Sequence, residues 1–242
     1  MKISAAISSV VALAVTNLAG AGVAASGSYT FSATQSGTGG TPTPGPIAYN
    51  GTAITGLTPG TVATSTGITY SASNNNFRAT NWALDGAPAG NLTGSIDTTK
   101  YIEFSVAAGS GYTFDLSSIT FGVGRSNTGP RNWQWRSSAD SFASALTNYT
   151  NLATGLTNSG GVLTNPDSNS AWTNNTLSFS GASFSGLSSI TLRLYGYNAE
   201  GTSGTGGLQG SLTFSVVVDA VPAPGAVALL GVAGLISTRR RR

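Results

Sequence analysis

The stretch Leu212-Thr213-Phe214-Ser215-Val216-Val217-Val218 places an apolar side chain at every second position. This period of two puts alternate side chains on opposite faces of a β-strand, one face buried and the other toward solvent. The same alternation recurs in residues 101–106, 118–123, 133–135, 177–179 and 190–195. These segments predict strands that each bury one face.

Turns rich in Gly, Asn and Ser separate the predicted strands, at residues 74–76, 108–111, 126–129, 158–161 and 200–207. Many short alternating strands joined in this way predict an all-β fold, an antiparallel β-sandwich of the jelly-roll type. Residues 36–46 are rich in Gly, Pro and Thr and predict a loop. In the body of the chain, a helical pattern occurs at residues 138–146, where Phe142 and Leu146 are four apart.

The composition excludes several kinds of catalytic and metal-binding site. The 242 residues include no cysteine and no histidine, and only 11 basic and 8 acidic side chains. Cysteine nucleophiles, disulfides, thiolate metal sites and every catalytic triad that uses histidine are therefore excluded. The net charge of +3 is small, so a folded domain is expected rather than a disordered chain. We expect a protein that is not an enzyme.

The positive charge is concentrated at the ends of the sequence. Arg239–Arg242 and Lys2 supply five of the 11 basic residues. Residues 26–219 carry six basic and eight acidic side chains, which gives them a net charge of −2. Affinity for nucleic acids needs clustered cations that neutralise phosphates, so no nucleic-acid partner is expected.

Residues 1–25 have the organisation of a secretory signal peptide. Lys2 supplies a positive charge, residues 3–15 form an apolar stretch, and small side chains follow through residues 19–25. Val23-Ala24-Ala25 satisfies the small-residue rule of signal peptidase, so cleavage is predicted after Ala25. The export machinery is therefore an expected partner. The alternative, an amphipathic helix of the domain, lacks a polar face at helical spacing.

Residues 220–242 combine two prolines, a short apolar run and a basic end. The run 226–236 would reach about 16 Å as a helix, against roughly 30 Å for the hydrocarbon core of a bilayer. Residues 221–238 would reach about 27 Å, a marginal transmembrane helix suited to a transient anchor. The positive-inside rule would hold the residues after it on the cytoplasmic side. These residues are Arg239, Arg240, Arg241 and Arg242, which would act as a membrane stop during export.

This order of features resembles the PEP-CTERM sorting signal of exported proteins of Gram-negative bacteria. Val221-Pro222-Ala223-Pro224-Gly225 matches the Val-Pro-x-Pro start of that signal, with Ala223 where the family most often has Glu. Residues 228–235 match its usual helix. The resemblance implies that an exosortase, a membrane cysteine protease, recognises and processes the segment after export. An ordinary tail anchor that is never cleaved is the alternative.

The acidic residues raise two further hypotheses. A glycosidase needs two carboxylates that face each other at roughly 5–10 Å, and Glu103 and Asp115 are the candidate pair. Ion pairing of such strand acids with Arg193 or Arg136 is the favoured alternative. We expect no cofactor and no metal site, with calcium as the alternative because aspartate oxygens and loop carbonyls suit it. The aspartates available for calcium are Asp85, Asp97, Asp140, Asp167 and Asp219.

Two pairs of aromatic residues could offer stacking faces to a polysaccharide. Trp133 and Trp135 share one strand face, where a core position is favoured because a core poor in Leu and Ile needs large side chains. Tyr195 and Tyr197 continue the polar face of Arg193, which makes them better candidates for contact with a glycan.

The sequence therefore predicts a signal peptide at 1–25, a β-sandwich domain at 26–219 and a sorting or anchoring segment at 220–242. The expected protein is exported to the cell surface or extracellular matrix, is transiently held by its C-terminal segment, and has a structural or adhesive role. Its expected partners are an exosortase-type protease and an extracellular polysaccharide. The alternatives are a lectin-like carbohydrate-binding module and a glycan-active enzyme.

Overall fold

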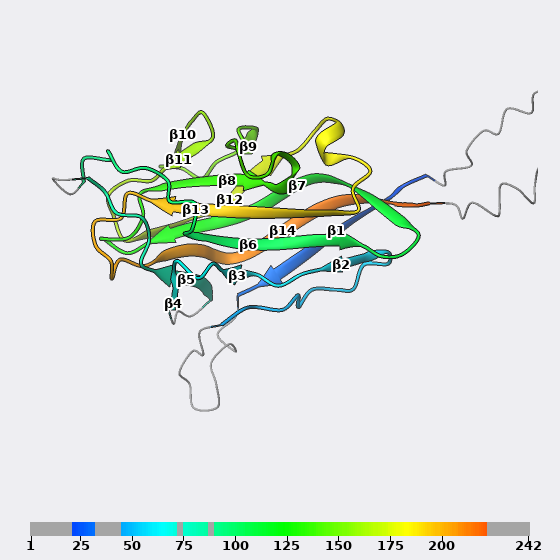
Figure 1. Cartoon of the computed structure of the whole chain (residues 1–242), viewed down its shortest axis with the longest axis horizontal. Coiled ribbons are helices and arrows are strands. Elements are labelled where there is room, and N and C mark those ends of the chain that lie inside the picture. The colour runs from blue at the N-terminus through cyan, green and yellow to red at the C-terminus, as the bar shows by residue number, and fades with distance from the viewer. Residues whose placement is uncertain (1–20, 32–44, 72–74, 87–89, 222–242) are drawn as a thin grey trace, which may run out of the picture.

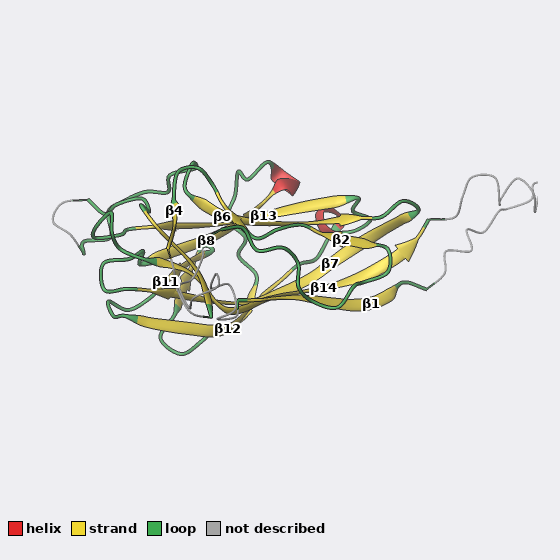
Figure 2. Cartoon of the chain, turned by 90° about the horizontal axis from the view of Figure 1, so that it is seen from below, coloured by secondary structure: helices red, strands yellow, loops and turns green. Residues whose placement is uncertain are grey.

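The computed structural model describes residues 21–31, 45–71, 75–86 and 90–221. These residues form two antiparallel sheets of seven strands that pack face to face. Figure 2 shows the two layers, with β6 and β13 in one and β1 and β14 in the other. The prediction of an all-β sandwich is confirmed. Several predicted segments lie outside the described residues, namely residues 1–20 of the signal peptide, most of the 36–46 loop, 222–225 of the sorting motif, the apolar run and Arg239–Arg242.

The first sheet has the order β4-β5-β14-β7-β12-β9, and β1 pairs with β14 beside this path. Its strands are β1 (Val23–Thr30), β4 (Thr69–Ser71), β5 (Asn76–Thr80), β7 (Tyr112–Arg125), β9 (Tyr149–Asn151), β12 (Ser170–Ser178) and β14 (Gly206–Ala220).

The second sheet has the order β10-β11-β8-β13-β6-β2, and β3 also pairs with β6. Its strands are β2 (Leu57–Pro59), β3 (Ala63–Thr64), β6 (Tyr101–Ala108), β8 (Asn132–Ser137), β10 (Thr157–Ser159), β11 (Val162–Thr164) and β13 (Ser189–Tyr197). From β5 onward the chain crosses repeatedly between the sheets, with only the β10–β11 hairpin staying in one sheet.

The core lies between the sheets and consists of the side chains that the alternation predicts to be buried. Phe121 on β7, Leu192 on β13 and Phe214 on β14 are each exposed by 1% or less. Trp135 on β8 packs edge to face against Phe121, with ring centroids 5.3 Å apart. Aromatic pairs of this kind add about 0.5–1.5 kcal/mol to the effect of area burial alone.

The predicted helical segment at residues 138–146 forms a single 3₁₀ turn, Ser138–Asp140. The backbone then becomes left-handed at Ser141 and Phe142, with φ values of 59° and 61°. This turn sends the Phe142 ring over the guanidinium of Arg193, 3.8 Å away, instead of along a helix. The contact between Phe142 and the sheet replaces the i, i+4 contact that the sequence suggested.

Both ends of the described sandwich lie at the same end of the molecule. Val23, at the start of β1, pairs with Val218 near the end of β14. The Val221 amide then donates a hydrogen bond to the Gly111 carbonyl at 2.8 Å. Figure 1 shows the start of β1 and the end of β14 side by side. The opposite end, where β7 ends and β14 begins, is formed by loops.

Candidate functional site

The aromatic residues proposed as glycan contacts are mostly inside the protein. Trp133 and Trp135 are fully buried, and Tyr195 is exposed by only 1%. The burial of Trp133 and Trp135 agrees with the core position favoured for them, and Tyr195 is covered instead of open to a glycan. The reason for Tyr195 is local, because its ring packs against Tyr101, 5.4 Å away, and lies under the guanidinium of Arg136.

Tyr197 is the one member of the four that is partly accessible. It lies at the end of β13, paired with Asn132 of β8. Burial raises the pKa of its phenol, and the positive charge of Arg136 partly offsets that rise. Tyr197 thus stays a neutral hydrogen-bonding group on the outer face of the second sheet. Within the described residues, every aromatic side chain is buried or half-buried.

The outer face of the second sheet carries a closed cluster of side chains around Arg193. Its Nε donates to Glu103 Oε2 at 3.0 Å. The guanidinium lies between two rings, 4.1 Å from the centroid of Tyr101 and 3.8 Å from that of Phe142. Each cation–π contact of this kind is worth about 0.5–1 kcal/mol near a surface. These groups satisfy one another, so the cluster stabilises the β6–β13 pairing.

The proposed catalytic pair of carboxylates is not brought together. Glu103 is on the outer face of the second sheet and is paired with Arg193. Asp115 is on β7 in the first sheet, between the buried Phe114 and Leu116, so its side chain points away from the core on the opposite side of the sandwich. Asp115 Oδ1 accepts a hydrogen bond from the Gly186 amide at 2.7 Å. These two residues do not form the facing pair that a glycosidase requires.

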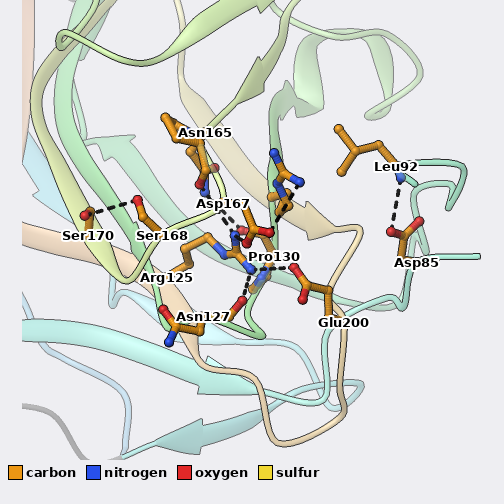
Figure 3. Close-up of polar contacts among 12 residues, drawn as sticks. Asp85, Leu92, Arg125, Asn127, Pro130, Asn165, Asp167, Ser168, Ser170 and Glu200 are labelled. Atoms are coloured by element: carbon orange, nitrogen blue, oxygen red, sulfur yellow. Dashed lines mark hydrogen bonds and ion pairs between the residues drawn. The ribbon is translucent and has the colours of Figure 1, made fainter. Parts of the chain in front are cut away.

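Most of the aspartates considered for calcium accept hydrogen bonds from the protein itself. Asp97 accepts from the amide and hydroxyl of Thr99, and Asp140 accepts from the amide of Ser144. Asp85 accepts from the amides of Gly86, Leu92, Thr93 and Gly94 and so joins residues 85–86 to residues 92–94; Figure 3 shows the contact with Leu92. Among the described residues, no group of three or more acidic side chains is placed to hold a metal ion.

A second polar site is a clamp around Arg125, at the end of β7. The Arg125 side chain is completely buried, and its Nη1 lies 2.8 Å from Asp167 Oδ1. Its Nη2 lies 2.9 Å from Glu200 Oε1 and also donates to the carbonyl of Asn127. Figure 3 shows these groups converging from three loops. One buried cation thus joins the loops that follow β7, β11 and β13.

The clamp has a clear electrostatic signature. The hydrogen bond from Arg125 is the main cause that holds the pKa of Asp167 below its ordinary value, although partial burial opposes it. Arg131 adds a weaker attraction, with its Nη1 3.9 Å from Asp167 Oδ2. Sequence reasoning missed this site. Arg125 lies 42 residues from Asp167 and 75 from Glu200, and no local pattern connects them.

An apolar groove lies at the opposite end of the sandwich, beside the start of β1 and the end of β14. Its volume is about 490 Å³, and it is lined chiefly by small and apolar side chains, including Val23, Ala25, Ile54, Tyr112 and Val218. Val23 and Val221, exposed by 67% and 50%, are two of the three exposed large apolar side chains in the described part of the chain. The apolar groove is therefore at one end of the sandwich and the Arg125 clamp at the other, where the third exposed apolar side chain, Leu84, lies beside Ala199.

The predicted signal-peptidase site falls within a strand. Ala25 is the third of the eight residues of β1 that pair with β14, opposite Val216, and its side chain packs against the core. The strand structure extends from Val23 to Ala220, three residues before the predicted start of the domain and one beyond its predicted end.

Comparison of the chain with protein-family models, with curated proteins and with solved structures gives no match. Within the ranges that the structure describes, no helix has the length and apolar character needed to cross a membrane.

Proposed function

We propose that this chain is an exported structural or adhesive protein of the cell surface or extracellular matrix, sorted by its C-terminal segment. The observation that carries the proposal is the placement of the chain ends. The sorting motif starts at Val221, at the apolar end of the sandwich, and the Arg125 clamp lies at the other end of β14. A strand of 15 residues separates these ends by roughly 45 Å.

This arrangement suits a protein that is held at a membrane by its tail. The tail would leave from the end that carries Val23 and Val221, and the loops joined by Arg125 would face outward. Loops that share a buried ion pair keep a fixed shape, as an adhesive or structural contact requires. The exosortase and the export machinery are the proposed partners, and an extracellular polysaccharide is the proposed contact.

The proposal includes a jelly-roll topology for the sandwich. It is supported by the strand orders of the two sheets, β5-β14-β7-β12 in one and β6-β13-β8-β11 in the other. Chain crossings between two sheets in this way are typical of two interlocked Greek keys.

Fractionation of cells tests the sorting proposal. In a Gram-negative host that has an exosortase, the full chain is expected at the surface, and a chain ending at Val221 is expected in the soluble exported fraction. A Pro222→Ala, Pro224→Ala double variant keeps the apolar run and the arginines, so it should accumulate unprocessed in the membrane. Normal surface delivery of the truncated chain would rule the proposal out. Unchanged behaviour of the double variant would favour the uncleaved tail anchor.

The alternative function is a carbohydrate-binding module. The observation that supports it is the partly accessible ring of Tyr197. A glycan array probed with the full chain separates the two functions. Binding that Tyr197→Ala abolishes and Tyr112→Ala retains would favour the binding module over a purely structural role. Tyr112 is a suitable control because it lies beside the apolar groove. Hydrolysis of an arrayed glycan would support the third candidate, a glycan-active enzyme.

A further inference from the structure

Strand β1 is part of the sandwich from its first residue. All eight of its residues pair with β14, from Val23 opposite Val218 to Thr30 opposite Ser211. On the inward face, Ala25 packs against the core and Tyr29 is fully buried. Residues 23–25 therefore share the pairing with β14 of the rest of the strand, although Val23 and Ala24 are exposed.

Removal of residues up to Ala25 would leave part of β14 without its neighbour. Val216, Val217 and Val218 would lose their partners on that side, because these three residues pair with Ala25, Ala24 and Val23. An uncovered edge of three consecutive valines is a template for pairing with another chain. The apolar groove would also lose part of its wall, since Val23 and Ala25 line it.

A second signal-peptidase pattern lies four residues earlier. Ala19-Gly20-Ala21 places small side chains at the two positions that the enzyme reads, with the cut following Ala21. The next residue, Gly22, lies against β14. A Cβ at Gly22 would be 2.4 Å from Val217 Cγ1 and 2.5 Å from Asp219 Oδ1, so a side chain there would force its neighbours to move.

We infer that signal peptidase cleaves the Ala21–Gly22 bond and that the mature protein begins at Gly22, which preserves β1. In this hydrolysis one water is taken up, leaving a carboxylate on Ala21 and an ammonium on Gly22. The new ammonium is carried by the residue whose Cβ position is 2.5 Å from Asp219 Oδ1, and this carboxylate has no ion-pair partner among the described residues. Cleavage thus creates an ion pair that fastens the first residue of the mature chain. This inference rests on the proposed export of the protein.

N-terminal sequencing of the exported protein, made from the full chain, tests the inference. A first residue of Gly22 supports it. A first residue of Ser26, or any other mature start, overturns it and leaves export intact. A chain that still begins at Met1 overturns the inference together with the export proposal.

Matched variants make the test independent of folding, because signal peptidase acts on the chain during export. Ala21→Val puts a β-branched side chain at the cleavage position and should raise the fraction of precursor at least tenfold. Ala25→Val makes the same change four residues later and should leave processing at the wild-type level. The reverse pattern, with only Ala25→Val blocking cleavage, would overturn the inference.

Discussion

At the scale of single residues, Arg125 is the buried cation that joins three loops at one end of the sandwich. Its guanidinium is fully buried, whereas Asp167 and Glu200 keep 54% and 20% of their side-chain surface exposed. Removal of one partner from a buried ion pair costs about 3–5 kcal/mol because the other charge is left uncompensated. Here the remaining acids can be partly hydrated, so the cost is expected to be smaller.

We therefore expect Arg125→Met to lower the free energy of unfolding by about 2–3 kcal/mol. Arg131→Met is the matched control, because Arg131 reaches the same carboxylate of Asp167 at 3.9 Å and should contribute about 1 kcal/mol or less. Urea denaturation at pH 7 measures both. Equal losses in the two variants would contradict the role assigned to Arg125.

Asp85 should make the protein sensitive to acid. Burial alone would raise the pKa of Asp85, but four backbone amides, from Leu92, Gly86, Gly94 and Thr93, lower it below the ordinary value of 3.8. A carboxyl group whose pKa is lower in the folded state stabilises the protein above its unfolded pKa. That contribution is lost as the pH falls from about 4 through the folded pKa.

Asp85→Asn should reduce the loss of stability at low pH. Urea denaturation between pH 7 and pH 3 measures the free energy of unfolding of both proteins. The variant should be less stable than the wild type at pH 7 and closer to it at pH 3. An unchanged gap at both pH values would show that the charge of Asp85 is not the stabilising feature.

Tyr29 should make the stability of the protein sensitive to alkali. Its hydroxyl donates to the Gly60 carbonyl at 2.7 Å, and burial, with a smaller effect of Tyr49, raises its pKa well above 10.0. Because the folded pKa is raised, the stabilisation is complete below the unfolded pKa of about 10 and is lost as the pH rises above it.

Absorbance at 295 nm should show Tyr29 and Tyr149 ionising only when the protein unfolds, because burial raises the pKa of both phenols. Tyr29→Phe should weaken the pH dependence of stability above about pH 10. Titration of every tyrosine in the folded protein would contradict this assignment.

At the scale of elements, Gly196 shows how β13 fits against the core. A Cβ at this position would lie 2.8 Å from atoms of both Trp133 and Trp82. These two rings pack edge to face with centroids 5.3 Å apart, so neither has room to retreat. Gly196→Ala is expected to lower the free energy of unfolding by about 1–3 kcal/mol, the usual cost of overpacking.

Gly201→Ala is the control for this prediction, because its Cβ would meet only Thr128, at 3.9 Å. A loss within about 0.5 kcal/mol is expected for it in thermal unfolding. Comparable losses in both variants would contradict the role assigned to contact with the tryptophans, because Gly→Ala by itself restricts the unfolded chain and does not destabilise the fold.

The sequence predicted the strands whose pattern is local. The alternation in residues 190–195 and 212–218 predicts β13 and β14, because each buried side chain is two residues from the next. The sequence did not predict β1, because the small side chains of Val23–Ala25 suit a signal-peptidase site as well as a strand. Pairing with β14 distinguishes the two, and such pairing connects residues almost 200 positions apart.

The outer face of the second sheet was predicted less well for a related reason. The alternation correctly placed Tyr195 opposite the inward Leu194, and a solvent-facing ring was expected from that pattern. Tyr101 and Arg136, on the two neighbouring strands, cover the ring from either side. Periodicity reports which face a side chain occupies, but it carries no information about neighbours on other strands.

At the scale of the whole molecule, the two ends of the sandwich have different surfaces. One end carries Val23, Val221 and the apolar groove, and the proposed sorting motif begins there. The other end gathers the loops that Arg125 joins. In the proposed orientation, residues 222–242 hold the apolar end at the membrane until processing releases the protein, and the clamped loops make the outward contact.

The intact mass of the protein released from the cell surface tests this account most directly. The proposed exosortase processing predicts a mature chain that has lost Arg239–Arg242 together with the apolar run before it. A released chain that retains the four arginines would contradict processing of the C-terminal segment and, with it, the proposed route to the surface.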